Sequence, residues 1–245
     1  MTKRYKYFPS GHPVPTMVVT QAGREAGMAP NKETPFFVSY ARARDGSGNL
    51  GTVRISDQMT KRFFFDLVEN VGQLISRTTG AEVGYMDTGT QAGADWRDEL
   101  LHAAGTCQVL IALLSAPYLS SEWCGKEWCA FSQRTRQPLP GVAAAPRQGH
   151  IIPVIWAPLP YPLSPPVSKE MVFSPTGNPK SELPAEYKEN GVYGLLRMEQ
   201  KDSYQITVWQ LARLISKIYH SQRLRSRKLR FEDLRDCFKG CGHDG

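Results

Sequence analysis

Residues 107–115 read CQVLIALLS, and this stretch is the strongest indication of the fold class. It contains the longest unbroken apolar run of the chain, residues 109–114, which has the length of a strand. A strand that is apolar on both faces is typical of the centre of a parallel sheet that helices cover on both sides. A membrane-spanning helix needs about 20 apolar residues, so the sequence predicts no membrane span.

Shorter apolar stretches on either side of this run predict four more strands. They are PFFVSYAR (35–42), AEVGYMD (81–87), HIIPVIWAP (150–158) and GVYGLLRM (191–198). Stretches with helical periodicity lie between them, so strands and helices alternate along the chain. This alternation predicts a flavodoxin-like α/β fold, with a doubly wound, five-stranded parallel sheet in a single domain with tails.

The predicted helices are placed by apolar residues at three- and four-residue steps and by capping residues. One helix is expected to begin after an Asp95 cap, and another after Ser120 or Ser121. The last helix carries an apolar stripe within residues 208–219. Residues 158–190 contain eight prolines and little periodicity, which predicts a long irregular connection before the fifth strand.

The expected place of a ligand site is the carboxyl edge of the sheet, where the loops follow the strands. These loops begin after Tyr40, Asp87 and Ser115. The sequence contains no GxGxxG, Walker A or HExxH motif. It therefore does not support an ordinary dinucleotide fold, a P-loop or a zinc protease site.

Composition divides the chain into a domain with two tails. Residues 1–34 are rich in Gly, Pro and polar groups and predict a flexible arm; residues 35–222 form the predicted domain, and 223–245 a basic tail with cysteines. The chain has 245 residues, of which 41% are hydrophobic and 22% charged, as in soluble globular proteins. Five cysteines, an odd number without regular spacing, do not predict a disulfide framework, and a cytoplasmic location is expected.

Much of the net charge of +7 lies at the two ends of the chain, including SQRLRSRKLR (221–230). Such a run can meet nucleic acid, acidic lipid or an acidic protein, but a solvated helix end or tail is the favoured interpretation. The stretch CFKGCGH (237–243) offers two thiols and an imidazole without a fourth ligand, so free thiols are favoured over a metal site.

Residues 120–134, SSEWCGKEWCAFSQR, combine tryptophans, cysteines, acids and bases in one predicted helix. Trp123 and Glu127 are four residues apart and therefore share a helix face. They could line a pocket in which the indole stacks on a planar ring and the acid accepts hydrogen bonds from ribose hydroxyls. On spacing alone, a core tryptophan and a surface ion pair of Glu127 are the favoured alternative. Cys124 and Cys129 are interpreted as packing thiols.

Several of these segments, in this order, resemble a Toll/interleukin receptor (TIR) domain. They are FFVSYAR, YMDTGTQAGADW and CQVLIALLSAPYLSSEWCGKEW, and the likeness runs from about Pro35 to about His220. The FFVSYA start, the SxxYxxSxWCGKEWxAF block (115–131) and VYGLLRM look similar to TIR-like proteins of actinobacteria. The long loop RARDGSGNLGTVRIS and the proline-rich stretch 158–190 depart from the family's pattern.

The resemblance implies a reaction and a set of site residues. Many TIR domains cleave NAD⁺ between nicotinamide and ribose, to give linear or cyclic ADP-ribose, and need no further cofactor. Glu127 matches the catalytic glutamate, and Trp123 its aromatic neighbour. The substrate-binding positions implied at the end of the first strand and in the loop after the second strand are Ser39, Tyr40, Ala41, Arg42, Asp87 and Trp96.

The resemblance also implies partners. We expect NAD⁺ as the ligand, self-association of TIR domains, and a separate sensor or effector protein in bacterial defence or stress signalling. A non-catalytic scaffold that assembles through the same domain is the alternative. A nucleoside-processing enzyme of similar topology is a third hypothesis, but it needs further pocket acids that the sequence does not place.

Overall fold

The structure is a computed structural model. It describes residues 34–42, 55–76, 81–87, 94–142, 149–159, 162–163, 165–176 and 183–239, and of 55–56 and 94–96 the backbone alone. All of them belong to the unit Lys32–Gly245. The predicted N-terminal arm lies outside the described residues except for Thr34, as does most of the long loop after the first strand.

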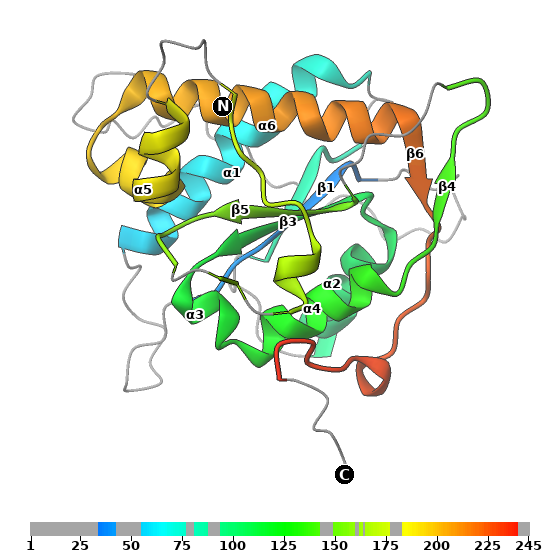
Figure 1. The fold of residues 1–245 in the computed structure, drawn as a ribbon. Helices are drawn as coiled ribbons and strands as arrows, with labels where there is room; N and C mark the ends of the chain where they lie inside the picture. Colours follow the sequence, from blue (N-terminus) through cyan, green and yellow to red (C-terminus); the bar gives the residue numbers. More distant parts are fainter. Residues whose placement is uncertain are drawn as a thin grey trace, which may run out of the picture. The chain divides into compact units, whose positions relative to one another are not determined.

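A parallel sheet forms the centre of the described part of the chain (Figure 1). Its four strands are β1 (Phe36–Ser39), β2 (Gly84–Met86), β3 (Val109–Leu114) and β5 (Ile151–Ile155), in the order β2-β1-β3-β5. The run 109–114 is indeed a central strand: it pairs with β1 on one side and β5 on the other, and every residue in it is buried. The prediction of a flavodoxin-like α/β fold is confirmed.

The predicted fifth strand is wrong. Residues 191–198 lie in helix α5 (Leu183–Arg197) and its end, and the helix is interrupted at Gly191, where φ is 63°. Val192 and Leu195 are three residues apart and fully buried, which is helical spacing rather than strand alternation. The break brings Gly191 so close to the carbonyl oxygen of Trp156 that a side chain would collide with it.

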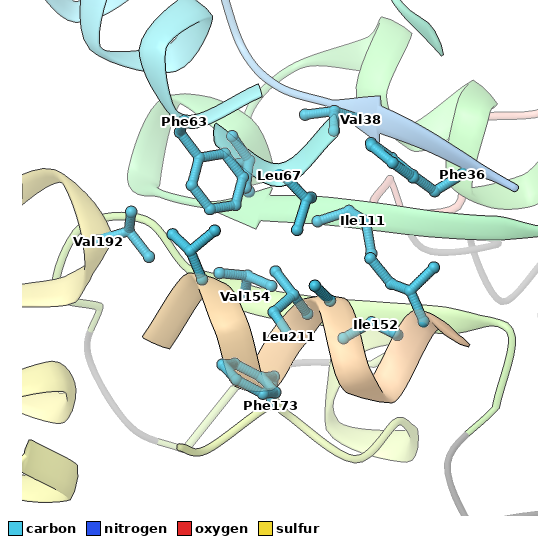
Figure 2. Close-up of a cluster of buried hydrophobic side chains, with 14 of the residues drawn as sticks. Phe36, Val38, Phe63, Leu67, Ile111, Ile152, Val154, Phe173, Val192 and Leu211 are labelled. Atoms are coloured by element: carbon cyan, nitrogen blue, oxygen red, sulfur yellow. The ribbon is translucent and has the colours of Figure 1, made fainter. Parts of the chain in front are cut away.

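Two layers of helices cover the sheet. One face is covered by α1 (Ile55–Leu74), α5 and α6 (Lys201–Ser221), and Figure 2 shows the apolar side chains packed between them and the strands. The other face carries α2 (Ala94–Thr106), α3 (Ala116–Leu119) and α4 (Glu122–Ser132). The Ser121 cap of α4 is confirmed, whereas α2 begins at Ala94, so Asp95 lies inside the helix and the Asp95 cap is wrong.

A small second sheet joins the end of α6 to the segment after α4. Strand β4 (Arg136–Pro138) pairs antiparallel with β6 (Gln222–Leu224), and neither strand was predicted. Within the described part of the proline-rich connection there is one short 3₁₀ helix, η1 (Val167–Lys169), before α5 begins.

The described part of the predicted tail packs against the helices. We call residues 225–239, which include the 3₁₀ helix η2 (Phe231–Asp233), the C-terminal strap. In Figure 1 it runs from β6 to the outer side of α4. Leu229 and Leu234 are buried in the same apolar cluster as α2 and α4, so the strap covers the helix layer that carries Glu127.

Candidate active site

Helix α4 brings Glu127 to the carboxyl end of β1. The Ser121 hydroxyl accepts a hydrogen bond from the Cys124 backbone N–H, 3.3 Å away, and so begins the helix. Glu127 lies in the next turn and faces the sheet, with only 5% of its surface exposed. The Ser39 hydroxyl, on the last residue of β1, donates a hydrogen bond to the Glu127 Oε2 atom. Glu127 is therefore not the surface ion-pair residue of the alternative interpretation.

A second hydroxyl extends this hydrogen-bonded chain. The Tyr118 hydroxyl lies 3.0 Å from Ser39 Oγ, and both side chains are buried. A serine hydroxyl has one proton, which Ser39 donates to Glu127, so Tyr118 must donate to Ser39. The order Tyr118, Ser39, Glu127 directs both protons towards the carboxyl oxygen.

Burial governs the protonation of Glu127. Desolvation raises its pKa from the usual 4.5 to about 8, and the Asp87 carboxylate adds to the increase. Hydrogen bonds from Ser39 and Trp123 and the charge of Arg42 oppose it. In this closed arrangement the carboxyl is largely neutral at pH 7, and it will ionise more readily when water or a cation reaches it.

Arg42 and Asp87 join the ends of β1 and β2. Their side chains form an ion pair, with 33% and 12% of the side chains exposed, so the pair lies at the surface edge of the site. The Asp87 carbonyl oxygen accepts hydrogen bonds from the Tyr40 hydroxyl at 3.0 Å and from Arg42 at 3.4 Å. These contacts hold the two loop starts together beside Glu127.

Trp123 lies one helical turn before Glu127 and is already stacked on a ring of the protein itself. Its partner is Phe231 of the C-terminal strap, with ring centroids 5.9 Å apart and planes inclined by 22°. Lys126 Nζ lies 4.6 Å and Arg97 Cζ 5.2 Å from the centroid of the same Phe231 ring. The aromatic position that the sequence predicts for a ligand ring is occupied by the chain.

The structure thus gathers most of the predicted site residues at one edge of the sheet. Ser39, Tyr40, Arg42, Asp87, Trp123 and Glu127 lie around the ends of β1 and β2 and the first turns of α4. Ala41 is half-buried and packs against the apolar cluster of this face. The Trp96 side chain and residues 88–93 lie outside the described residues.

Sequence analysis missed Tyr118 and Phe231. Tyr118 stands in the block SxxYxxSxWCGKEWxAF that carries the resemblance, but it was given no role in the site. Phe231 sits among basic residues, but Leu229, Phe231 and Leu234 together form an apolar series that indicates a packed segment. Which helix it packs on is a long-range contact that no local pattern carries.

The thiols and the acids show no reactive or metal-binding arrangement in the described part of the chain. Cys124 and Cys129 are buried, and burial raises the pKa of the Cys124 thiol, which agrees with packing thiols. No cluster of three or more His, Cys, Asp or Glu that could hold a metal ion occurs among the described residues. None of the helices described is both long and apolar enough to cross a membrane.

Fold and site together define a doubly wound α/β domain with a buried carboxyl at the carboxyl edge of the sheet. The family model of the TIR domain matches residues 65–175, from within α1 to the segment after η1, and this range includes Asp87, Trp123 and Glu127. The match supports a TIR domain in this chain, and the parallel four-stranded sheet flanked by helices is consistent with the TIR fold. Searches of curated proteins and of solved structures each returned no significant match.

Proposed function

We propose that the protein is a TIR-domain NAD⁺ glycohydrolase in which Glu127 is the catalytic residue. The observation that carries the proposal is the carboxyl of Glu127 at the carboxyl end of β1, hydrogen-bonded to Ser39 and one turn from Trp123. TIR domains act in signalling, and some of them cleave NAD⁺. The proposal includes a role in bacterial defence or stress signalling, with TIR self-association and a separate sensor or effector protein.

The chemistry requires one carboxylate. The bond between ribose C1′ and the pyridinium nitrogen breaks, its electron pair stays on the nitrogen, and nicotinamide leaves as a neutral molecule. Positive charge develops on the ribose, where an ionised carboxylate stabilises it. Water then adds to C1′ and loses a proton, which gives ADP-ribose; attack by a nitrogen of the adenine ring gives a cyclic product.

The Ser39 hydroxyl and the Trp123 indole assist this carboxylate. Ser39 and Trp123 stabilise the ionised form of Glu127, because both lower its pKa. A pyridinium ring in the site adds a positive charge near the carboxyl and lowers the pKa further. Binding of the cationic substrate would therefore generate the carboxylate that the reaction uses.

A non-catalytic scaffold is the second candidate, and one observation favours it. Ser39 is 1% and Glu127 5% exposed, and Phe231 covers the face of Trp123. A domain that only assembles with other domains could keep such a site closed. Under this hypothesis Glu127 is a buried polar residue of the core.

Nicotinamide release separates the two hypotheses. Concentrated protein, with and without a crowding agent, is incubated with NAD⁺, and free nicotinamide is measured by chromatography. Release is expected, and Glu127→Gln, which keeps the shape of the side chain and can accept the hydrogen bond from Ser39, should abolish it. A Glu69→Gln protein, altered at an exposed acid of α1, serves as the control and should retain it.

Two other results would redirect the proposal. If neither the wild type nor Glu69→Gln releases nicotinamide under any crowding condition, the scaffold is favoured. Release that is equal in the wild type and in Glu127→Gln would mean that another residue carries the reaction.

A further inference from the structure

The C-terminal strap meets the candidate site at a place with the character of a ligand site. The Phe231 ring stacks on the indole of Trp123 on α4, and the cations of Lys126 on α4 and Arg97 on α2 lie near the same ring. We call the three residues that surround this ring, Trp123, Lys126 and Arg97, the aromatic–cationic seat. Phe231 itself is half-buried, so its ring fills the seat from the solvent side.

The strap is held down at two points beside the seat. The Arg227 backbone N–H donates to the carbonyl oxygen of Gly105 at 3.0 Å, and the Cys237 N–H donates to the carbonyl oxygen of Gly125 at 3.3 Å. Both acceptors are glycines, and a methyl group at either would collide with the strap, at Gly105 with the backbone oxygen of Arg227. The close approach depends on these two glycines.

The contact that a ligand has to replace at the seat is the stacking of Phe231 on Trp123. Three backbone hydrogen bonds, donated by Arg225, Arg227 and Cys237, join the strap to the rest of the domain. Its apolar contacts are those of the buried Leu229 and Leu234 and of Phe238 against Tyr118 and Trp128. The Lys239 ammonium lies 3.4 Å from the Glu122 carboxylate in an exposed ion pair, and such pairs contribute about 0–1 kcal/mol.

The charge around the seat selects the kind of ring that suits it. Lys126 is paired with Glu122 at 2.8 Å, and Arg97 adds a second cation over the same ring. Phe231 has no charge to offer these cations. A planar ring with phosphate groups would gain both the stacking on Trp123 and charge-assisted hydrogen bonds to Arg97 and Lys126.

We propose that the aromatic–cationic seat is a binding site for a planar ring that carries phosphate groups, and that Phe231 occupies it as a built-in competitor. The ligand class is a nucleoside diphosphate, and the inference rests on the proposed function only in that NAD⁺ contains this group. Opening requires the strap to lift, which exposes the Trp123 face beside Glu127. The closed strap then keeps the domain in a resting state.

ADP binding to the full chain tests the proposal without turnover. In a Glu127→Gln background, ADP is titrated by calorimetry into the parent and into three variants, Phe231→Ala, Gly105→Ala and Phe65→Ala. Phe231→Ala removes the competitor, and Gly105→Ala pushes the strap away at a position outside the seat. Phe65→Ala is the matched control, because it removes a ring of the same size that is 60% exposed on α1.

Phe231→Ala and Gly105→Ala are each expected to tighten the dissociation constant of ADP by about tenfold, the effect of stacking one base on an aromatic ring. Phe65→Ala should leave it unchanged. Adding Arg97→Gln to Phe231→Ala should weaken ADP binding but leave adenosine binding unchanged. Unchanged ADP affinity in both strap variants would overturn the proposal, as would an equal gain in Phe65→Ala.

Nicotinamide release separates this inference from the proposed function. It is measured with the same strap variants made in the wild-type protein, which retains Glu127. Tighter ADP binding without release in any variant would reject the glycohydrolase and leave the seat in place. Release that does not respond to Phe231→Ala or Gly105→Ala, with unchanged ADP affinity, would reject the seat and leave the glycohydrolase.

Discussion

The two faces of the sheet are covered by helices of similar amphipathic character but different content. Helix α6, on one face, buries Val208, Leu211 and Ile215 at regular helical steps. Helix α4, on the other, buries Glu127 together with Trp128 and two cysteines. The polar side chains that α6 buries, Thr207 and Ser221, are neutral hydroxyls that donate to backbone carbonyls of their own helix. Helix α4 instead buries a carboxyl group, Glu127, at the carboxyl edge of the sheet. This buried carboxyl group is what locates the candidate site.

The largest expected effect is on stability and comes from a substitution on the face covered by α6. Leu211 is fully buried in the apolar cluster around α6 (Figure 2), so Leu211→Ala should lower the free energy of unfolding by about 2–5 kcal/mol. Urea unfolding measures this change. Trp209→Ala, at a position 41% exposed on the same helix, should change stability by less than about 0.5 kcal/mol. Equal effects at the two positions would contradict the assigned burial.

The second prediction concerns the opposite face, where a polar residue is buried. Folding raises the pKa of Glu127 from 4.5 to about 8, so between these pH values the folded protein holds a proton that the unfolded chain has released. The proton bound to Glu127 therefore contributes fully to the stability of the folded protein below pH 4.5. This contribution is lost as the pH rises to about 8. Glu127→Gln, which cannot ionise, should become more stable than the wild type as the pH rises through this window.

Thermal unfolding of the two proteins at pH 5, 6.5 and 8 measures this difference. Glu69→Gln, with a change at an exposed acid of α1, should follow the wild type at every pH. A constant difference between Glu127→Gln and the wild type across this range would show that Glu127 ionises as an exposed acid does.

The contrast between the faces also explains which parts of the structure the sequence could predict. Residues 109–114 could be predicted as a central strand because a continuous apolar run of this length fits few other structures. GVYGLLRM was mistaken for a strand because it is short and apolar, although Val192 and Leu195 have helical spacing. On the α4 face, the four-residue step from Trp123 to Glu127 indicated a shared helix face, and the resemblance to TIR domains suggested their role.

What the sequence could not predict is how segments far apart in the chain meet on the α4 face. Ser39 and Glu127 are separated by 88 positions, and their hydrogen bond follows from the order of strands in the sheet. The strap was interpreted as a solvated tail because of its basic residues, yet Leu229 and Leu234 bury it against α2 and α4. Charge describes the outer side of such a segment, while its few apolar residues determine where it docks.

A smaller effect is expected from Ser39→Ala, which removes the hydrogen bond that stabilises the ionised carboxyl. The pKa of Glu127 should rise, because Ser39 is the strongest of the groups that lower it. The acid limb of the pH profile of nicotinamide release, which follows ionisation of Glu127, should then move to higher pH. The value of kcat at the top of the profile should change less than the position of the limb. A profile that does not move would mean that Ser39 does not act on this ionisation.

The smallest effect is expected from Tyr118→Phe, which keeps the ring against Phe238 and removes only the hydroxyl that donates to Ser39. Without this donor, Ser39 becomes a slightly weaker donor to Glu127, since hydrogen bonds in a chain polarise one another. The acid limb should move in the same direction as in Ser39→Ala but by less. In the double variant Ser39→Ala, Tyr118→Phe, the second change should add nothing, because Tyr118 acts on Glu127 only through Ser39. Additive shifts in the double variant would show that Tyr118 affects the carboxyl by a separate route, and the hydroxyl chain would then be two independent contacts.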